Sequence, residues 1–342
     1  MMRADKYAWF LFLTLVCWMW PLQAFSETKI KLVTPLPTGS AHYQVLEAMG
    51  QKWRAASGGA VSLTIFGDGT QGGEVETVQR MRMGQIQAAT LSASGLSEID
   101  PSVGALEKIP MVYRSLDEME YVRSHMRAEI ENRLEAKGFV VLFWADTGWI
   151  NIFSRKPALH PDEFRKTNVF VGATDHEEFE LVKALGFPPV PLEWSDVLTS
   201  LHTGMVDTIP TAPFLALAGQ YDTVAKHMLD IPWVPLVGGT VITTKAWNSI
   251  PPQYRDAFRQ AAIEAGQQMQ ARGRKESLEA VEAMKKRGLQ VHTASPAILD
   301  EWQKFAEAVY PRMRGTMVPA DMFDEVLRLL QEYRSSKAGA KS

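Results

Sequence analysis

The sequence predicts an α/β protein of two lobes, and three observations lead to this expectation. Residues 164–213 alternate apolar patterns of period 2 and period 3.6, in the order strand, helix, strand, helix, strand. Residues 29–91 show the same order without repeating the sequence. Even without its first 26 residues, the chain is longer than one hydrophobic core usually supports. Open α/β sheets usually bind ligands at the carboxyl ends of their strands, so those ends are the first places to look for function.

The first 26 residues are typical of a secretory signal peptide. Arg3 and Lys6 form a basic start, and an almost unbroken apolar run over residues 7–20 follows, which is short for a membrane span. Small residues precede Glu27, where we expect cleavage. The alternative is an uncleaved anchor. Cleavage places the mature protein in the periplasm, across the inner membrane.

The composition is that of an ordinary soluble globular protein, with 46% hydrophobic and 22% charged residues. A net charge of −3 offers no basic surface for nucleic acid. No segment after the leader approaches the length of a membrane span, so we expect no membrane insertion after cleavage. Cys17 is the only cysteine and lies in the leader, so the mature chain is expected to need neither disulfides nor a thiol catalyst.

The first lobe is predicted from strands that alternate with amphipathic helices. The helix over residues 41–57 turns Val45 and Trp53 inward, with other apolar residues at helical spacing. The strand over residues 86–91 alternates poorly, which is typical of a strand buried on both faces. In chain order the expected elements are strand 29–34, helix 41–57, strand 61–66, helix 74–83 and strand 86–91.

A glycine-rich turn, Gly67-Asp-Gly-Thr-Gln-Gly72, connects a strand to a helix and matches the spacing of a dinucleotide fingerprint. That fingerprint also needs an acidic residue about 20 positions further on, to hold the ribose. None stands around residues 87–92. The two interpretations are a nucleotide site and a turn in which glycine lets the chain reverse tightly.

The middle of the chain passes from the first lobe to the second. A helix is expected over residues 116–137, because apolar residues recur there at helical spacing. Residues 139–144 are predicted to form an interior strand, and residues 145–154 an extended crossing into the second lobe. The elements expected after it are strand 168–172, helix 177–186, strand 189–192, helix 195–204, strand 206–210 and strand 238–244.

The C-terminal part is predicted to be helical. Residues 252–287 form one long charged stretch with few helix breakers, and helices are expected at 295–313 and 320–333. Residues 335–342 are predicted to be a polar frayed tail. The predicted boundaries are residues 27–146 and 238–270 for the first lobe, 147–237 for the second, 252–287 for the long helix and 288–334 for the C-terminal helices.

Catalytic and metal-binding motifs are missing from the sequence. The seven histidines are scattered, and there is no His-Glu-x-x-His pair, no Gly-x-Ser-x-Gly elbow and no phosphate-binding lysine loop. Asp175 to Glu178 is the densest group of potential metal ligands, but the helix dipole favours acidic residues at a helix start. We therefore predict no metal, no cofactor and no enzymatic activity. A catalytic group assembled from distant residues is the alternative.

With these elements placed, the chain resembles the extracytoplasmic solute-binding proteins of tripartite ATP-independent periplasmic (TRAP) transporters, of the dicarboxylate-binding, DctP-like type. The resemblance covers roughly Ile30 to Tyr333. Its most specific mark is the run from Trp194 to Asp207, where the family shows Glu-Val-Tyr-x-Ala-Leu-Gln-x-Gly-x-Val-Asp. The other marks are Gly72-Gly-Glu74, Val78 to Gly84, Ile109 to Tyr113 and Leu159 to Phe164.

The resemblance implies a two-lobed periplasmic-binding-protein fold with crossing strands, in which residues 252–287 form a long bracing helix. It also implies capture of a small organic solute in a cleft between the lobes, and delivery to the membrane subunits of a TRAP transporter. Two other interpretations are a sensor or lipid-handling binding protein on the same fold, and an exported enzyme.

The chain departs from the family where a carboxylate of the ligand is expected. Family members place an arginine in the strand that follows the Leu159 to Phe164 segment, and here Phe170 occupies that position. Trp149 stands where a second arginine is common. We therefore expect a ligand more apolar than a C4-dicarboxylate, unless Arg155 or Lys156 holds the carboxylate instead. The predicted ligand-binding residues are Ser92, Trp149, Phe170, Thr211, Phe214 and Trp233.

Overall fold

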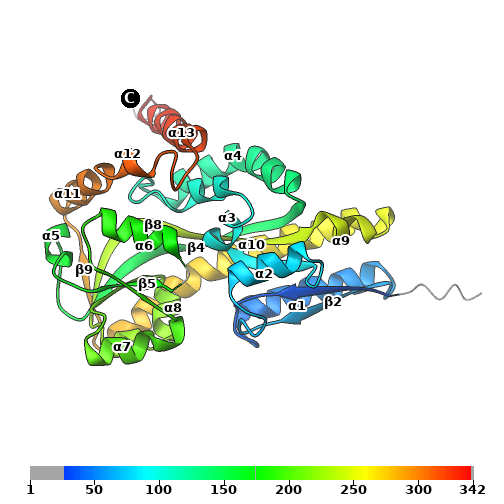
Figure 1. The fold of residues 1–342 in the computed structure, drawn as a ribbon, viewed down its shortest axis with the longest axis horizontal. Coiled ribbons are helices and arrows are strands. Elements are labelled where there is room, and N and C mark those ends of the chain that lie inside the picture. Colours follow the sequence, from blue (N-terminus) through cyan, green and yellow to red (C-terminus); the bar gives the residue numbers. More distant parts are fainter. Residues whose placement is uncertain (1–26, 174, 340–342) are drawn as a thin grey trace, which may run out of the picture.

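The computed structural model describes residues 27–173 and 175–339. The predicted signal peptide lies outside these residues. In the described part of the chain, one mixed sheet of nine strands is covered by helices on both faces (Figure 1). The predicted α/β class is confirmed.

The strands of the sheet form two similar sets of three parallel strands, one set in each half of the molecule. In each set the first strand in the sequence lies between the other two. The sets are β1 (Thr28–Val33), β2 (Val61–Phe66) and β3 (Ala88–Ser92) in the first half, and β5 (Val169–Gly172), β6 (Pro189–Leu192) and β7 (Thr208–Thr211) in the second.

Two long antiparallel strands, β4 (Phe139–Ser154) and β8 (His227–Thr243), run through both halves and join them. β3 pairs with the last part of β8, and β7 pairs with the last part of β4. The register of β4 on β8 shifts between Asp146 and Trp149, where the chain passes from one half to the other. The strand order is β2-β1-β3-β8-β4-β7-β5-β6, with β9 (Gln290–Thr293) parallel to β8.

The helices begin and end near the predicted positions in most of the chain. In order they are α1 (Ala41–Ala56), α2 (Glu74–Arg82), α3 (Ala93–Ser97), α4 (Leu116–Ala136), α5 (Pro161–Phe164), α6 (His176–Ala184), α7 (Val197–Thr203), α8 (Pro213–Ala218), α9 (Thr244–Ser249), α10 (Pro252–Lys286), α11 (Pro296–Glu307), α12 (Tyr310–Met313) and α13 (Ala320–Gly339). Three short 3-10 helices span Pro101–Leu106, Trp194–Asp196 and Tyr221–Thr223.

The helices divide between the two faces of the sheet. Figure 1 shows α3, α4 and the helices α11 to α13 above β4 and β8, with α1, α7 and α8 below them. Side chains of a strand alternate between these faces. On β5, Val169 and Val171 join the core on the α6 side, whereas Phe170 joins the core on the α7 and α8 side.

Helix α10 spans both halves and packs against β4, α1 and α8. A glycine allows its close approach, because a Cβ atom at Gly273 would lie 2.6 Å from the methyl carbon of Thr147. The buried carboxylate of Asp146 accepts two hydrogen bonds from Arg274, at 2.7 and 2.8 Å. The long helix is therefore fixed to β4 at the point where the strand register shifts.

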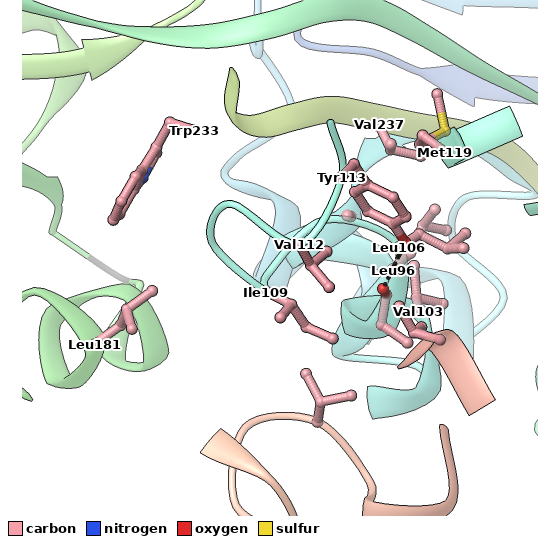
Figure 2. Close-up of a cluster of buried hydrophobic side chains, with 14 of the residues drawn as sticks. Leu96, Val103, Leu106, Ile109, Val112, Tyr113, Met119, Leu181, Trp233 and Val237 are labelled. Carbon is pink, nitrogen blue, oxygen red and sulfur yellow. Dashed lines mark hydrogen bonds between the residues drawn. The ribbon is translucent and has the colours of Figure 1, made fainter. Parts of the chain in front are cut away.

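The predicted Ile109 to Tyr113 motif forms a buried loop rather than a helix or strand. The hydroxyl of Tyr113 donates to the carbonyl oxygen of Ala105 at 3.2 Å, the dashed line in Figure 2. Arg334 of α13 donates to the carbonyl oxygen of Val112 at 2.8 Å. The C-terminal helix thus holds this loop in place.

Two predicted strands are longer than expected. Residues 139–144 and the crossing 145–154 form one strand, β4, because the extended chain continues to pair with β8 beyond the register shift. Residues 238–244 are only the last part of β8, which starts at His227.

The C-terminal prediction needs three corrections. Residues 290–293 form β9 rather than helix. The helix predicted over 295–313 is divided into α11 and α12, and Pro311 in the first turn of α12 has no N–H to continue the first helix. The expected tail is helical as far as Gly339, since its alanine and lysine favour helix and Lys337 lies 5.5 Å from the ring centre of Tyr333.

Candidate functional site

The carboxyl ends of the two sets of parallel strands face each other. In the first half, α1 and α3 begin there, just after β1 and β3; in the second half, α6 and α8 begin there, just after β5 and β7. Contacts between these helix starts show that the two sets of ends meet. We call the starts of these four helices the facing edges.

The first contact between the halves joins α3 to α6. The hydroxyl of Ser94 donates to Asp175 Oδ2 at 2.9 Å. The other carboxylate oxygen of Asp175 accepts from the backbone N–H of Glu178 at 2.9 Å and caps α6. Lys108 forms an ion pair with Glu177 close by. Asp175 thus serves as a helix cap and as the link between the halves.

The second contact joins α1 to α8, on the opposite face of the sheet. The rings of His42 and Phe214 are stacked, with centroids 5.8 Å apart and an interplanar angle of 30°. Helix α10 supports this contact from behind, because Nδ1 of His42 lies 3.2 Å from Glu276 Oε2. Arg272, one turn earlier, donates to the carbonyl oxygen of Ala41 at 3.2 Å.

Half-buried carboxyl groups surround the first contact. Glu74 accepts from the backbone N–H and the hydroxyl of Ser92, at 2.7 and 2.5 Å, and burial raises its pKa. Burial raises the pKa of Glu107 to about 8. Burial also raises the pKa of Glu178 to about 8, and the charge of Asp175 adds to that effect. We call Glu74, Glu107, Asp175 and Glu178 the acidic cluster.

The acidic cluster determines which ligand charges this region can accept. Lys108 lies beside it, and burial lowers the pKa of this lysine although its acidic neighbours oppose that change. At neutral pH, Glu107 and Glu178 are mostly protonated and can donate hydrogen bonds. A negatively charged group of a ligand would therefore meet carboxyl groups here, with Lys108 beside them. A neutral polar group of a ligand can instead form a hydrogen bond with a protonated carboxyl.

Three buried polar atoms, on α1, β4 and β7, have no hydrogen-bond partner among the described residues. They are Nε2 of His42 and the hydroxyl oxygens of Thr147 and Thr211. Thr147 packs on α10 beside Gly273, and Thr211 precedes Phe214 by three residues. Buried polar groups in folded proteins are nearly always paired, so these atoms are candidates for contact with a bound molecule.

Ser92 lies at the facing edges as the N-cap of α3, whereas Phe170 is the second residue of β5 and lies within the strand. The hydroxyl of Ser92 is already used, because it donates to Glu74 and caps α3 by accepting from the N–H of Gly95. Phe170 is only 2% exposed and belongs to the core beneath α7 and α8. The ring of Trp194, which is 50% exposed, meets the Phe170 ring edge to face, with centroids 4.7 Å apart. The buried ring of Phe170 thus packs against the half-exposed ring of Trp194.

The two predicted tryptophans do not join Phe170. Trp149 is half-buried on β4, opposite Pro235 of β8. Trp233 lies on the α6 side of the sheet, toward Leu181 in Figure 2, and its ring meets Trp302 edge to face at 5.6 Å. It lines a partly open pocket of about 40 Å³, room for a water molecule or two. The structure therefore divides the predicted aromatic set between the two faces of the sheet.

The alternative cations lie away from the facing edges. Arg155 follows the end of β4, beside the amino ends of β5 and β7, and its Nη1 lies 3.1 Å from Asp207 Oδ1. Lys156 is exposed on the same loop, and its carbonyl oxygen accepts from Ser154. Both residues thus lie at the opposite ends of the strands. This position contradicts the alternative that Arg155 or Lys156 holds a ligand carboxylate at the facing edges.

The glycine-rich turn ties two connections of the first half together. Asp68 accepts from the backbone N–H and the hydroxyl of Thr38, at 2.9 and 2.6 Å. A Cβ atom at Gly67 would lie 2.7 Å from the Thr38 hydroxyl oxygen, so only glycine fits there without displacement. This geometry favours the tight turn over the nucleotide site.

Several residues at the facing edges were not predicted. His42 and Glu107 carried no signal, because scattered histidines and glutamates have no informative spacing. Trp194 was part of the most specific family mark, and its position after β6 could have identified it as an edge residue. Within residues 27–173 and 175–339, no three histidine or acidic side chains are arranged so that they could hold a metal ion. None of the helices described there has the length and apolar character of a membrane span.

The chain is similar to a known family over most of its length. The family described as bacterial extracellular solute-binding protein, family 7, matches residues 32–316. The C4-dicarboxylate-binding periplasmic protein DctP of Rhodobacter capsulatus is 21% identical over 282 residues, which are 82% of this chain and 83% of that protein.

Solved structures share the fold. A TRAP periplasmic solute-binding protein from Ralstonia eutropha with bound (S)-2-acetolactate has a TM-score of 0.80 at 20% identity, covering 90% of this chain and 99% of that one. An extracytoplasmic solute receptor from Bordetella pertussis that binds pyroglutamic acid has a TM-score of 0.80 at 18% identity, covering 89% and 100%. The two-lobed fold with crossing strands and a long helix is thus that of known solute-binding proteins.

Proposed function

Because the chain belongs to the bacterial extracellular solute-binding proteins of family 7, we propose that it captures a small organic solute between its two halves and delivers it to the membrane subunits of a TRAP transporter. The family is one of binding proteins, so this chain is not an enzyme. The relatives named as periplasmic, together with the predicted signal peptide, support a periplasmic location.

We propose that the two halves act as lobes that close on the solute. The facing edges are linked at two separate places, Ser94 with Asp175 on one face of the sheet and His42 with Phe214 on the other. Both links cross between the halves, so opening the molecule breaks them and closing it restores them. Bending would occur where β4 shifts register, between Asp146 and Trp149. The closed shape is then what the membrane partner recognises.

We propose further that the solute is neutral or carries a single carboxylate, with an apolar body. This proposal depends on Phe170, which occupies the position in β5 where related proteins are expected to place an arginine. Arg155 does not replace that arginine, because it is paired with Asp207 at the other ends of the strands. A C4-dicarboxylate would bring two charges, without a forked cation at the position of Phe170 to receive them.

The exposed ring of Trp194 supports the apolar part of this proposal. A half-exposed indole held edge-on by a buried phenyl ring is a rigid surface against which an apolar or aromatic body can pack. Related proteins crystallised with acetolactate or pyroglutamic acid hold small monoacids, which is consistent with a single carboxylate at most.

Mass spectrometry tests this function directly. The mature protein, purified under gentle conditions, is expected to release a small organic molecule on denaturation, and that molecule should raise the unfolding temperature when it is added back. Recovery of a C4-dicarboxylate would contradict the proposed ligand class. If no organic molecule in a broad extract stabilises the protein, solute capture itself is contradicted.

A further inference from the structure

His42 lies between the two halves and is 5% exposed. It is the second residue of α1 in the first half, its ring stacks on Phe214 of the second half, and α10 contacts it from behind. A buried imidazole at the junction of three helices can serve structure alone through this packing. Whether His42 also has a further role depends on the partners of its two ring nitrogens.

The contact of Nδ1 favours one tautomer of the ring. Nδ1 lies 3.2 Å from Glu276 Oε2, and an ionised carboxylate can only accept hydrogen bonds. The negative charge of this carboxylate, at ion-pair distance, favours a proton on Nδ1. Burial lowers the pKa of His42, with the charge of Glu276 opposing that change and Arg272 adding to it. The neutral ring is favoured, so Nε2 has no proton and presents a lone pair.

Nε2 has no hydrogen-bond partner in the described part of the chain, although it is fully enclosed. The hydroxyl of Thr211 is a second unpartnered polar atom on the strand that leads to Phe214. Two independent polar atoms without partners thus lie on α1, which carries His42, and on β7, which precedes Phe214.

We propose that His42 is a specificity-determining residue that accepts, through Nε2, a hydrogen bond from a hydroxyl or N–H group of the bound solute. This inference rests on the proposed function and names the polar chemistry of the ligand. A lone pair at Nε2 repels an ionised carboxylate oxygen and favours a donor. The solute therefore carries a hydroxyl or N–H group at the end that meets His42, in addition to its apolar body.

The tautomer is tested by nitrogen NMR of the mature protein labelled at histidine. The predicted result is a neutral His42 with the proton on Nδ1 and none on Nε2. Glu276→Gln supplies the matched comparison, because an amide can donate to Nδ1 and let the proton move to Nε2. A wild-type ring with its proton on Nε2 would overturn the proposal.

Ligand discrimination is tested with two probes that differ by one hydroxyl, mandelate and phenylacetate, by calorimetry on the mature protein. The wild type is expected to bind mandelate about tenfold more tightly than phenylacetate, the effect of one neutral hydrogen bond. His42→Asn places an amide where Nδ1 stood and should abolish this difference. In His42→Gln the side-chain amide reaches the position of Nε2, so most of the affinity difference between the two probes should remain. Glu276→Gln should make this difference smaller.

The outcomes separate this inference from the function on which it rests. Equal binding of both probes by the wild type, or a difference that survives His42→Asn, would overturn the role of His42 and leave solute capture intact. Binding of neither probe would count against both proposals. Loss of binding in all three variants alike would assign His42 a purely structural role, which also overturns the proposal.

Discussion

The ring of His42 on α1 stacks on the ring of Phe214 on α8, with centroids 5.8 Å apart. The two residues come from opposite halves and are 172 positions apart in the sequence. This stack and the Ser94 to Asp175 hydrogen bond lie on opposite faces of the sheet, so together they restrain the halves from both sides. These contacts therefore help to hold the two halves in the arrangement seen here.

Phe214→Ala is expected to favour an open form. An aromatic pair contributes about 0.5–1.5 kcal/mol, so its loss should shift the balance between open and closed forms by roughly two- to tenfold. Small-angle X-ray scattering of the mature protein should show a larger radius of gyration. Leu215→Ala, which truncates an exposed neighbour on the same helix, is the control. Identical scattering from both variants would contradict a closing role for the stack.

Asp146→Ala is expected to destabilise the whole molecule. Its carboxylate is buried and holds Arg274 with two hydrogen bonds and Gln270 with a third at 2.6 Å. Removing one partner of a buried ion pair costs about 3–5 kcal/mol. Urea unfolding should show this loss, whereas Asp300→Ala, in an exposed pair with Lys304, should cost less than about 1 kcal/mol. A small effect at Asp146 would show that α10 does not depend on this anchor.

Glu107→Gln is expected to change how stability depends on pH. Burial raises the pKa of Glu107 from 4.5 to about 8, so between these values the folded protein holds a proton that the unfolded chain releases. As pH rises from 4.5 to about 8, such a group therefore lowers the free energy of unfolding. Above about 8 it causes no further decrease. The variant, which cannot ionise there, should gain stability relative to the wild type from pH 5 to pH 8.

The same reasoning applies to Glu178, whose pKa is also raised to about 8. Urea unfolding at several pH values, with Glu107→Gln, Glu178→Gln and the double variant, measures the effect. A difference between variant and wild type that is constant with pH would show that neither carboxyl titrates in this range.

The sequence allowed most of the fold to be predicted, because the periods of the apolar residues match the elements. The two sets of three strands follow from alternating strand and helix patterns with glycine and proline at the joins. The continuous length of β4 and β8 could not be predicted, because Gly148 and several prolines interrupt the pattern and pairing across the halves is a tertiary property. The short strand β9 was missed for the same reason, since only its partner β8 makes it extended.

The candidate site was predictable only in part. The rule that ligands bind at strand carboxyl ends correctly placed Ser92, Thr211 and Phe214 at or next to the facing edges. Trp233 was chosen for its residue type, but alternation along β8 turns it into the core on the α6 side. His42 was missed, because its partners Glu276 and Phe214 are distant in sequence. The ligand-binding roles themselves remain predictions.

Trp194 and Phe170 should respond differently to truncation. Phe170→Ala removes a buried ring and should lower the free energy of unfolding by about 3–5 kcal/mol. Trp194→Ala removes a half-exposed ring and should change stability by far less, yet weaken binding of an aromatic monoacid. Urea unfolding and calorimetry with phenylacetate measure both effects. Unchanged affinity in Trp194→Ala would remove Trp194 from the ligand surface.

Calorimetry of the unaltered mature protein with succinate and with phenylacetate tests the central claim most directly. Phe170 occupies β5 where a forked cation is expected, and the only candidates the sequence offered in its place lie at the opposite ends of the strands. Phenylacetate is predicted to bind at least about tenfold more tightly than succinate, because Phe170 stands where a forked cation would receive a second carboxylate. Succinate binding with a Kd of about 1 μM or lower would contradict the account and would show that another cation receives the second carboxylate.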